Sequence, residues 1–141
     1  MSRFVVDASV AVKWVVTEEN SPAALRFLEA GHAMAVPDLF FAEVASVFQK
    51  KCRRGEMIIE DAETALRCML AIPLEAHAAQ NLAEDALRLS SRCGASVYDG
   101  IYLALAERQR CPLITADERL ARQVSATNFS EEVRVLQQAE G

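Results

Sequence analysis

The sequence predicts an α/β fold in which a central parallel sheet is covered by helices on both faces. Short apolar segments of strand length alternate with longer segments that have the spacing of helices. Most of these short segments are almost entirely apolar, as expected for strands buried on both faces of a sheet. Hydrophobic residues make up 52% of the 141 residues, while glycine (5) and proline (4) are scarce. This composition excludes a disordered chain and allows one sizeable domain.

The first half of the chain is expected to hold two strands and three helices. Ser21 and Pro22 suit the N-cap and first position of a helix, and Gly31 suits its end. Pro37 ends a short apolar segment, and Asp38 behind it can cap the next helix. The expected elements are a strand over 4–6, helices over 9–18 and 21–31, a strand over 33–36 and a helix over 38–53.

The second half is expected to hold more helix than strand. Pro73 stops one helix, Gly94 follows another, and Ser96 can cap a third. The expected elements are helices over 60–71, 76–92, 96–107 and 117–124, and strands over 112–115 and 133–136.

Charge and cysteine spacing limit the class of protein. The net charge of −5 argues against a nucleic-acid binder, although a cluster of acids reverses its local sign when it binds divalent cations. The cysteines have no CxxC spacing, so we expect reduced thiols in a cytoplasmic protein. The apolar N-terminus is interrupted by Asp7 and Lys13, so neither a membrane span nor a signal peptide is expected. The cysteines are Cys52, Cys68, Cys93 and Cys111.

Four carboxylates stand at informative positions. Asp7 and Asp117 each follow an apolar strand, Asp99 lies in the first turn of an apolar helix, and Glu43 lies early in another. For Asp7 and Asp117 the alternative role is a helix N-cap, and for Asp99 it is a capping box with Ser96. Glu43 is the only charge in an otherwise apolar or small run, and a buried glutamate needs a partner or a metal.

All four acids can converge at one edge of a parallel sheet, where ligands bind in such folds. Carboxylates that crowd together repel one another unless a cation compensates, and hard oxygen ligands suit Mg²⁺ or Mn²⁺ rather than zinc. His32 and His77 are isolated and do not form a competing zinc site.

These motifs resemble those of the PIN-domain ribonucleases, in particular the VapC-type toxins of prokaryotic toxin–antitoxin pairs. The resemblance covers nearly the whole chain, and four individually weak motifs in the right order make it specific. The matching stretches are Val5–Ser9, Pro37–Val44, Tyr98–Ala106 and Leu113–Leu120.

The resemblance implies a single PIN domain over 1–141, built as a three-layer α/β/α sandwich around a parallel sheet. It also implies endonucleolytic cleavage of RNA with Mg²⁺ or Mn²⁺, a homodimer, and inhibition by a small antitoxin. The catalytic acids would be Asp7, Glu43, Asp99 and Asp117, beside hydroxyl groups at Ser9 and Thr115.

Roles follow from the chemistry of phosphodiester hydrolysis, in which divalent ions activate water and stabilise the leaving oxygen. We expect Asp7 and Asp99 to ligate metal directly, and Glu43 and Asp117 to ligate a second ion or hold metal-bound waters. Ser9 and Thr115 would orient acids or water, and their alternative role is ordinary turn capping.

RNA affinity is expected from basic residues outside the acids. Lys50 lies two turns from Glu43 on one helix face, and Arg119 and Arg122 share a face after Asp117. The alternative is that these residues lie on a solvated helix surface, where a positive charge near the helix C-terminus interacts favourably with the helix dipole.

Three other classes of protein share some of these sequence features. An aspartate-based phosphatase usually needs a second aspartate two residues after the first, where this chain has Ser9. A receiver domain needs a phospho-accepting aspartate on a middle strand and a late strand-end lysine, and neither is found. A catalytically silent protein that keeps the fold and acts by binding a partner is distinguished only by an RNase assay.

Overall fold

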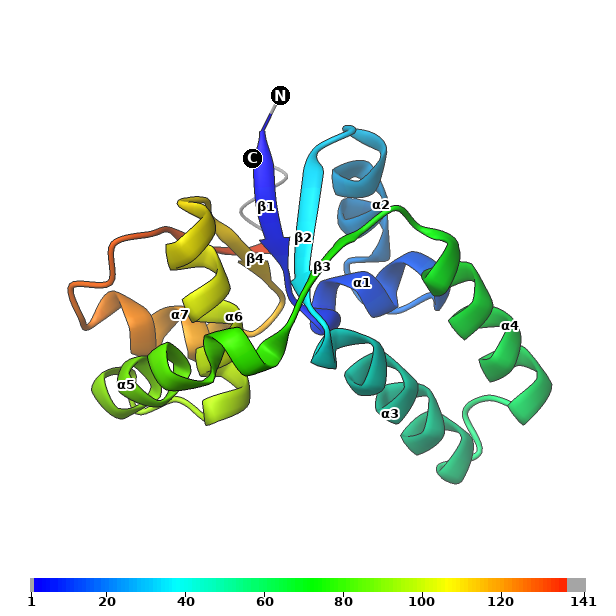
Figure 1. Cartoon of the computed structure of the whole chain (residues 1–141). Coiled ribbons are helices and arrows are strands. Elements are labelled where there is room, and N and C mark those ends of the chain that lie inside the picture. Colours follow the sequence, from blue (N-terminus) through cyan, green and yellow to red (C-terminus); the bar gives the residue numbers. More distant parts are fainter. Residues whose placement is uncertain (1, 137–141) are drawn as a thin grey trace.

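The computed structural model describes residues 2–136, and the chain folds around one five-stranded parallel sheet (Figure 1). The expected single domain over 1–141 includes Met1 and residues 137–141, which lie outside the described residues. Within residues 2–136 no helix is long and apolar enough to cross a membrane. The strands, in spatial order, are β3 (Glu75–His77), β2 (Ala33–Pro37), β1 (Arg3–Val6), β4 (Leu113–Thr115) and β5 (Val133–Val135).

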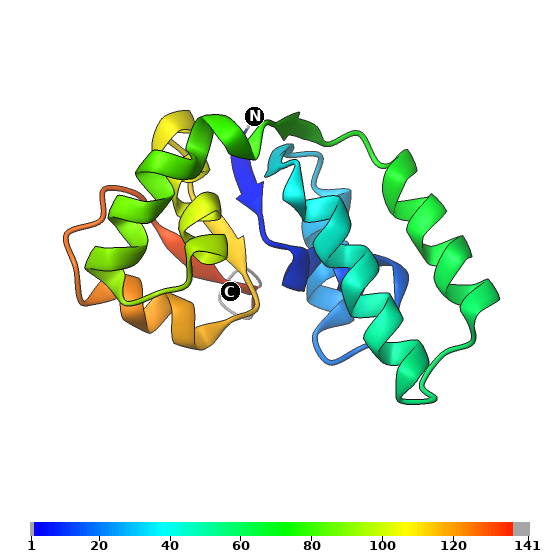
Figure 2. The same ribbon diagram turned by 60° about the horizontal axis from the view of Figure 1, so that its bottom comes forward.

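Helices cover both faces of this sheet. Figures 1 and 2 show α1 to α4 on one side and α5 to α7 on the other, which confirms the three-layer α/β/α arrangement. The helices are α1 (Ala8–Val15), α2 (Ser21–Glu29), α3 (Leu39–Arg53), α4 (Ile59–Ala71), α5 (Ala83–Cys93), α6 (Val97–Gln109) and α7 (Glu118–Ser125).

The central strand divides the interior into two cores. Phe4 and Val6 of β1 pack with α1 to α4, whereas Val5 between them packs with α5, α6 and α7. Because successive side chains of a strand point to opposite faces, a fully apolar strand is needed at this place. This explains why the short segments lack polar alternation.

The order of the strands fixes where a site can form. The chain runs outward from β1 through β2 to β3, returns to β4 beside β1, and then continues to β5. The direction therefore switches between β1 and β4, and in such sheets ligands bind outside the carboxyl ends at the switch point.

One expected helix begins in the wrong place. Residues 76 and 77, expected at the start of a helix over 76–92, instead lie in the edge strand β3, and a 3₁₀ turn over Ala79–Leu82 precedes α5. Pairing of Glu75 with Ala35 and of His77 with Pro37 overrides the local helical preference.

Two of the expected caps also differ. Asp38 occupies the N-cap position of α3, but its side chain accepts a hydrogen bond from the amide of Ala79 instead of capping that helix. Ser21 lies inside α2, whose N-cap is Asn20, and its hydroxyl bonds the backbone of Glu18 and Val16.

Candidate active site

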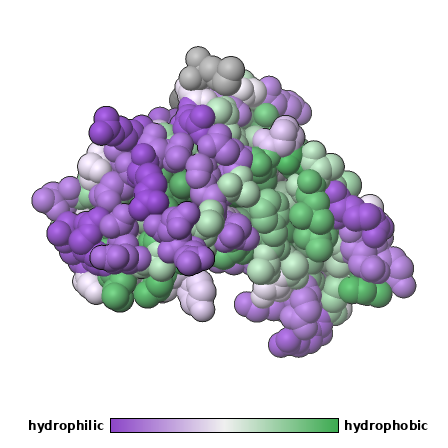
Figure 3. All heavy atoms as spheres, viewed as in Figure 1, coloured by the Kyte–Doolittle hydropathy of each residue, from purple (hydrophilic) through white to green (hydrophobic). Residues whose placement is uncertain are grey.

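The four predicted acids reach the carboxyl edge of the sheet from four separate segments. Asp7 directly follows β1, Asp117 lies two residues beyond β4, Glu43 lies early in α3, and Asp99 lies in the first turn of α6. The strands point toward the lower edge of Figure 1, and Figure 3 shows the surface hollowed there, between α3 and the side that carries α5 to α7. The acids thus gather at the switch point of the sheet.

Asp7 is held by two hydroxyl groups. Its Oδ2 accepts hydrogen bonds from Ser9 Oγ at 2.8 Å and from Thr115 Oγ1 at 2.7 Å. Asp7 stands at the N-cap position of α1, but its side chain makes no capping hydrogen bond. Within residues 2–136, Oδ1 has no hydrogen-bond partner, so this oxygen remains available as a ligand.

Ser9 and Thr115 are in turn fixed by the backbone. Ser9 Oγ accepts from the amide of Ala116 at 3.0 Å, and Thr115 Oγ1 accepts from the amide of Asp117 at 3.0 Å. Both hydroxyl groups therefore stabilise a turn and orient Asp7 at the same time, so the two roles considered from the sequence coexist.

Glu43 is bound by a tyrosine that the sequence analysis did not single out. The hydroxyl of Tyr102 donates to Glu43 Oε1 at 2.6 Å across 59 positions of sequence. Tyr102 is 1% exposed, and its hydroxyl also interacts with the backbone of Ala8 at the start of α1. The useful signal was a tyrosine inside the apolar run Ile101–Ala106, because a buried tyrosine hydroxyl needs a hydrogen-bond partner.

Asp99 and Asp117 both lie at capped helix N-termini and also belong to the acidic site. The amide of Asp99 donates to Ser96 Oγ at 3.1 Å, so Ser96 caps α6 as expected. Asp117 Oδ1 accepts from the amide of Leu120 at 3.2 Å and caps α7, as the alternative role expected. The cap at Ser96 uses the amide of Asp99, and the cap of α7 uses Oδ1 of Asp117 alone, so both carboxylates keep oxygens for other partners.

The electrostatics show that the acids act on one another. Burial raises the pKa of Asp7, and the charges of Asp99 and Asp117 raise it further, against the two hydroxyl donors. Burial and the charges of Asp7 and Asp99 raise the pKa of Glu43, against the Tyr102 hydrogen bond. Burial and the Asp117 charge raise the pKa of Asp99, against Ser96 and Arg119. A group of acids with raised pKa values is a typical functional site and favours binding of a cation.

This donor set fits Mg²⁺ or Mn²⁺ in its chemistry, because it offers carboxylate oxygens only. In residues 2–136 no three acid, histidine or cysteine side chains are gathered closely enough to hold an ion by themselves. Mg²⁺ is commonly bound by one or two carboxylates together with water and substrate phosphates, so this spacing is compatible with it.

The predicted basic residues differ in their relation to the acids. The charge of Arg119 acts on Asp99, which places it near the cluster. Arg122 lies 4.0 Å from Glu118 on the exposed side of α7, and Lys50 is exposed near the end of α3. Among the described contacts, neither Lys50 nor Arg122 touches one of the four acids.

Comparisons with known proteins agree with this geometry. Residues 4–125 match the PIN domain family. The chain is 33% identical to Ribonuclease VapC3 of Pyrobaculum aerophilum over 126 residues, 88% of this chain and 96% of the relative. The chain belongs to the PIN-domain family, among the VapC proteins.

Two solved structures show the same fold. VapC20 of Mycobacterium tuberculosis, described as a Sarcin-Ricin loop cleaving toxin, matches with a TM-score of 0.68 at 18% identity, over 93% of this chain and 98% of the other. DNA-bound VapBC from Salmonella typhimurium matches with a TM-score of 0.62 at 14% identity, over 96% of this chain and 99% of the other.

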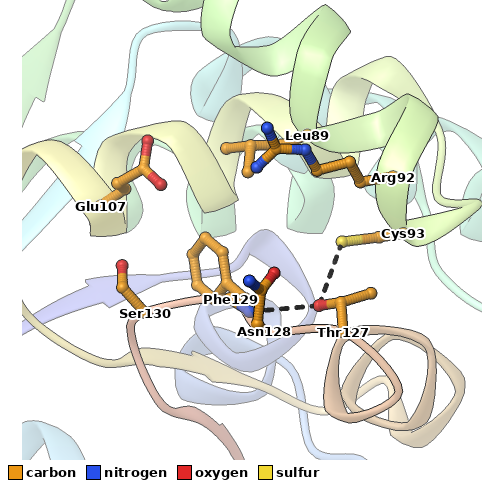
Figure 4. A pocket seen from close by; sticks show the side chains of 8 residues that line it. All are labelled: Leu89, Arg92, Cys93, Glu107, Thr127, Asn128, Phe129 and Ser130. Carbon is orange, nitrogen blue, oxygen red and sulfur yellow. Dashed lines mark hydrogen bonds between the residues drawn. The ribbon is translucent and has the colours of Figure 1, made fainter.

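This PIN domain also has a small hollow of about 110 Å³ away from the four acids (Figure 4). Thr127 Oγ1 donates to the carbonyl of Val124 at 2.7 Å and accepts from the amide of Phe129 at 3.3 Å, so this hydroxyl is satisfied locally, and none of the four acids lines the hollow. We therefore assign it no part in the active site. Its lining residues are Leu89, Arg92, Cys93, Glu107, Thr127, Asn128, Phe129 and Ser130.

Proposed function

We propose that this PIN-domain protein is a metal-dependent endoribonuclease that acts as the toxin of a toxin–antitoxin pair. The observation that carries the proposal is the convergence of Asp7, Glu43, Asp99 and Asp117 at the switch point of the sheet, three of them with raised pKa values. The 33% identity to a protein named a VapC ribonuclease, over 96% of that relative, supports the same activity.

Asp7 and Asp99 are the proposed direct ligands of Mg²⁺ or Mn²⁺, and Glu43 and Asp117 complete the acidic site. When bound, a divalent ion neutralises phosphate charge, lowers the pKa of water and stabilises the leaving oxygen. Ser9 and Thr115 fix Asp7 through Oδ2, which leaves Oδ1 facing no protein donor.

Glu43 is held from the opposite helical layer by Tyr102, and it can accept a proton because its pKa is raised. The tyrosine donor keeps one oxygen of this carboxylate in a fixed place, so the other oxygen is free to bind water. A general base needs both a fixed position and a pKa closer to neutrality than an exposed carboxylate has.

Phosphate contacts are proposed for Arg119, whose charge already acts on Asp99, and further along the RNA for Lys50 and Arg122. Basic side chains of this kind supply affinity that does not depend on sequence and weakens with salt.

The antitoxin and a second copy of the chain are the proposed protein partners. Apolar side chains gather on the part of the surface formed by α1 to α4 (Figure 3), and an apolar hollow of about 200 Å³ lies between α3 and α4. Ile58 and Ile59 are 62% and 58% exposed there, which is unusual for a surface without a partner. The Salmonella typhimurium neighbour is a VapBC assembly, which supports an antitoxin for this chain.

The deciding experiment is an RNase assay on purified protein with Mg²⁺, with Mn²⁺, and with excess EDTA, beside Asp7→Asn. We expect cleavage only in the wild type with a divalent ion, and a Mg²⁺-dependent rise in melting temperature that Asp7→Asn reduces. Robust cleavage in EDTA would refute metal dependence. A folded wild type that binds a partner but cuts no RNA under any of these conditions would support the silent alternative.

The two partners can be tested separately. Light scattering at micromolar concentration should show a dimer, and a persistent monomer would refute the homodimer. Co-expression with a small protein encoded beside the gene should relieve growth arrest, and failure of that rescue would refute the pairing.

A further inference from the structure

One exposed aromatic side chain stands next to the acidic site and has no part in the roles described so far. Tyr98 is 66% exposed, whereas Tyr102, the only other tyrosine, is buried. Within residues 2–136, the side chain of Tyr98 makes no hydrogen bond and no ring contact. Tyrosine has a large apolar ring with a polar hydroxyl and is enriched at binding surfaces, so an exposed tyrosine beside a site is a candidate contact.

Helix geometry places Tyr98 at the mouth of the site. Tyr98 and Tyr102 are four residues apart in α6, so they lie one above the other on the same face. Tyr102 reaches Glu43, and Asp99 immediately follows Tyr98. Side chains in a helix lean toward its N-terminus, so the ring of Tyr98 lies one turn beyond that of Tyr102, and its 66% exposure places it on the solvent side.

The turn that carries Tyr98 is rigid. Ser96 Oγ accepts from the amide of Asp99 at 3.1 Å, and the Ser96 carbonyl accepts from the amide of Gly100 at 2.9 Å. A Cβ built on Gly100 would lie 2.5 Å from the carbonyl oxygen of Ala86, so α6 is packed directly against the backbone of α5. A tyrosine on a fixed turn has only two side-chain torsions to order on binding, which makes it an inexpensive contact.

The chemistry of this surface favours a nucleobase over a protein partner. The other strongly exposed large apolar residues of the described chain are aliphatic, and Tyr98 is the single aromatic among them. A flat ring matches the face of any base, and such stacking dominates the binding of single strands. Arg119 lies near Asp99 and offers a phosphate contact at the same place.

We propose that Tyr98 stacks on an unpaired base of the RNA, next to the phosphodiester that is cut. This proposal rests on the proposed ribonuclease function. A base in a duplex already stacks on its neighbours, and it would have to be unstacked before Tyr98 could reach its face.

The test compares Tyr98→Ala, Tyr98→Phe and Tyr98→Trp, each combined with Asp7→Asn so that the RNA is not cut. Affinity is measured with Mg²⁺ for a 12-nucleotide RNA as a single strand and as a duplex of the same sequence. Loss of one stacked base by alanine substitution corresponds to about 1–3 kcal/mol, so Tyr98→Ala should weaken single-strand binding by about 5- to 150-fold. Tyr98→Phe and Tyr98→Trp keep a ring and should stay close to the parent.

Tyr98→Trp adds a direct readout of stacking. The single native tryptophan, Trp14, is buried with its Nε1 bonded to the carbonyl of Ala24, so it should respond little to RNA. Fluorescence of a tryptophan at position 98 should be quenched by the single strand, and much less when the RNA is made abasic. The matched control is Leu87→Ala on α5, where an equally exposed side chain (60%) is removed and no change is expected.

The possible results distinguish failure of the ribonuclease proposal from failure of the stacking proposal. If wild-type protein neither binds nor cuts RNA, the ribonuclease proposal fails and this one with it. If wild type cuts RNA but Tyr98→Ala binds it as well as the parent, only the stacking proposal is overturned. The same conclusion follows if Tyr98→Ala keeps RNA affinity and instead alters the oligomeric state, because Tyr98 would then be a protein contact.

Discussion

The hydrogen bond between Tyr102 and Glu43 can be removed by a single atom change, Tyr102→Phe. The hydroxyl is buried and donates to Glu43 Oε1 at 2.6 Å, so the bond is of the charge-assisted type. A hydrogen bond to a charged group contributes about 1.5–3 kcal/mol, and the substitution adds no volume and leaves the ring in place. At roughly 4 °C per kcal/mol for a chain of this length, the melting temperature should fall by roughly 6–12 °C.

The loss of stability in Tyr102→Phe should be larger at high pH than at low pH. The Tyr102 hydrogen bond lowers the pKa of Glu43, so it stabilises the ionised carboxylate more than the protonated one. Its contribution is therefore present above the pKa of Glu43 and shrinks as the pH falls through that value. Melts of wild type and variant at pH 4 and pH 8 should differ more at pH 8.

Tyr98→Phe is the matched control for this prediction, since it removes the hydroxyl of the other, exposed tyrosine. It should change the free energy of unfolding by less than about 0.5 kcal/mol. The reasoning is refuted if Tyr102→Phe melts like Tyr98→Phe, or if its deficit is the same at both pH values. RNA cleavage by Tyr102→Phe should fall while substrate affinity is kept, because the substitution releases Glu43 and touches no RNA.

Three further predictions concern the acids and the packing of α6 against α5. Burial raises the pKa values of three acids, so the folded metal-free protein binds protons that the unfolded chain has already released. Its stability should therefore fall as pH rises from about 4 through those raised values. Melts in EDTA should show this fall, Asp99→Asn should reduce it and Mg²⁺ should offset it; rising stability would contradict the cluster. Asp117→Asn should keep the cap on Leu120 and the wild-type melting temperature or exceed it, yet lose RNA cleavage, whereas Asp117→Ala should also lose about 1 kcal/mol. Gly100→Ala should destabilise by about 1–3 kcal/mol despite the better helix propensity of alanine, because the new Cβ meets the Ala86 carbonyl at 2.5 Å; a stabilised variant would show that α6 moves freely.

The sequence was most informative where neighbouring residues alone determine the position, or where every strand of a parallel sheet leads to the same position. An acid directly behind an apolar strand, as with Asp7, must lie at a carboxyl edge whichever strands are neighbours, because all strands of a parallel sheet end there. The cap of α6 by Ser96 depends on residues within one turn and was also predictable. The order of strands and helices therefore followed from the pattern, apart from the edge strand β3.

The sequence was least informative where distant segments meet. Nothing local identifies the hydrogen-bond partner of Tyr102, because Glu43 lies 59 positions away. The hydroxyl of Thr115 bonds Asp7 across 108 positions, so spacing along the chain carries no signal for it. The edge strand at Glu75 was missed for the same reason: its pairing with Ala35 across 40 positions is tertiary, and its own residues have little strand preference.

The two helical layers are contiguous in the chain, and this has a consequence for synthesis. Residues 7–71 supply the helices of one layer together with Asp7 and Glu43, and residues 83–125 supply the other together with Asp99 and Asp117. A chain emerging from a ribosome at about 5–20 residues per second therefore holds only half of the acids for several seconds. The strand β4, which completes the switch point, arrives near the end. A nascent chain cannot assemble the four-acid site before Asp117 has emerged, so any cutting of RNA is delayed until both helical layers have been synthesised.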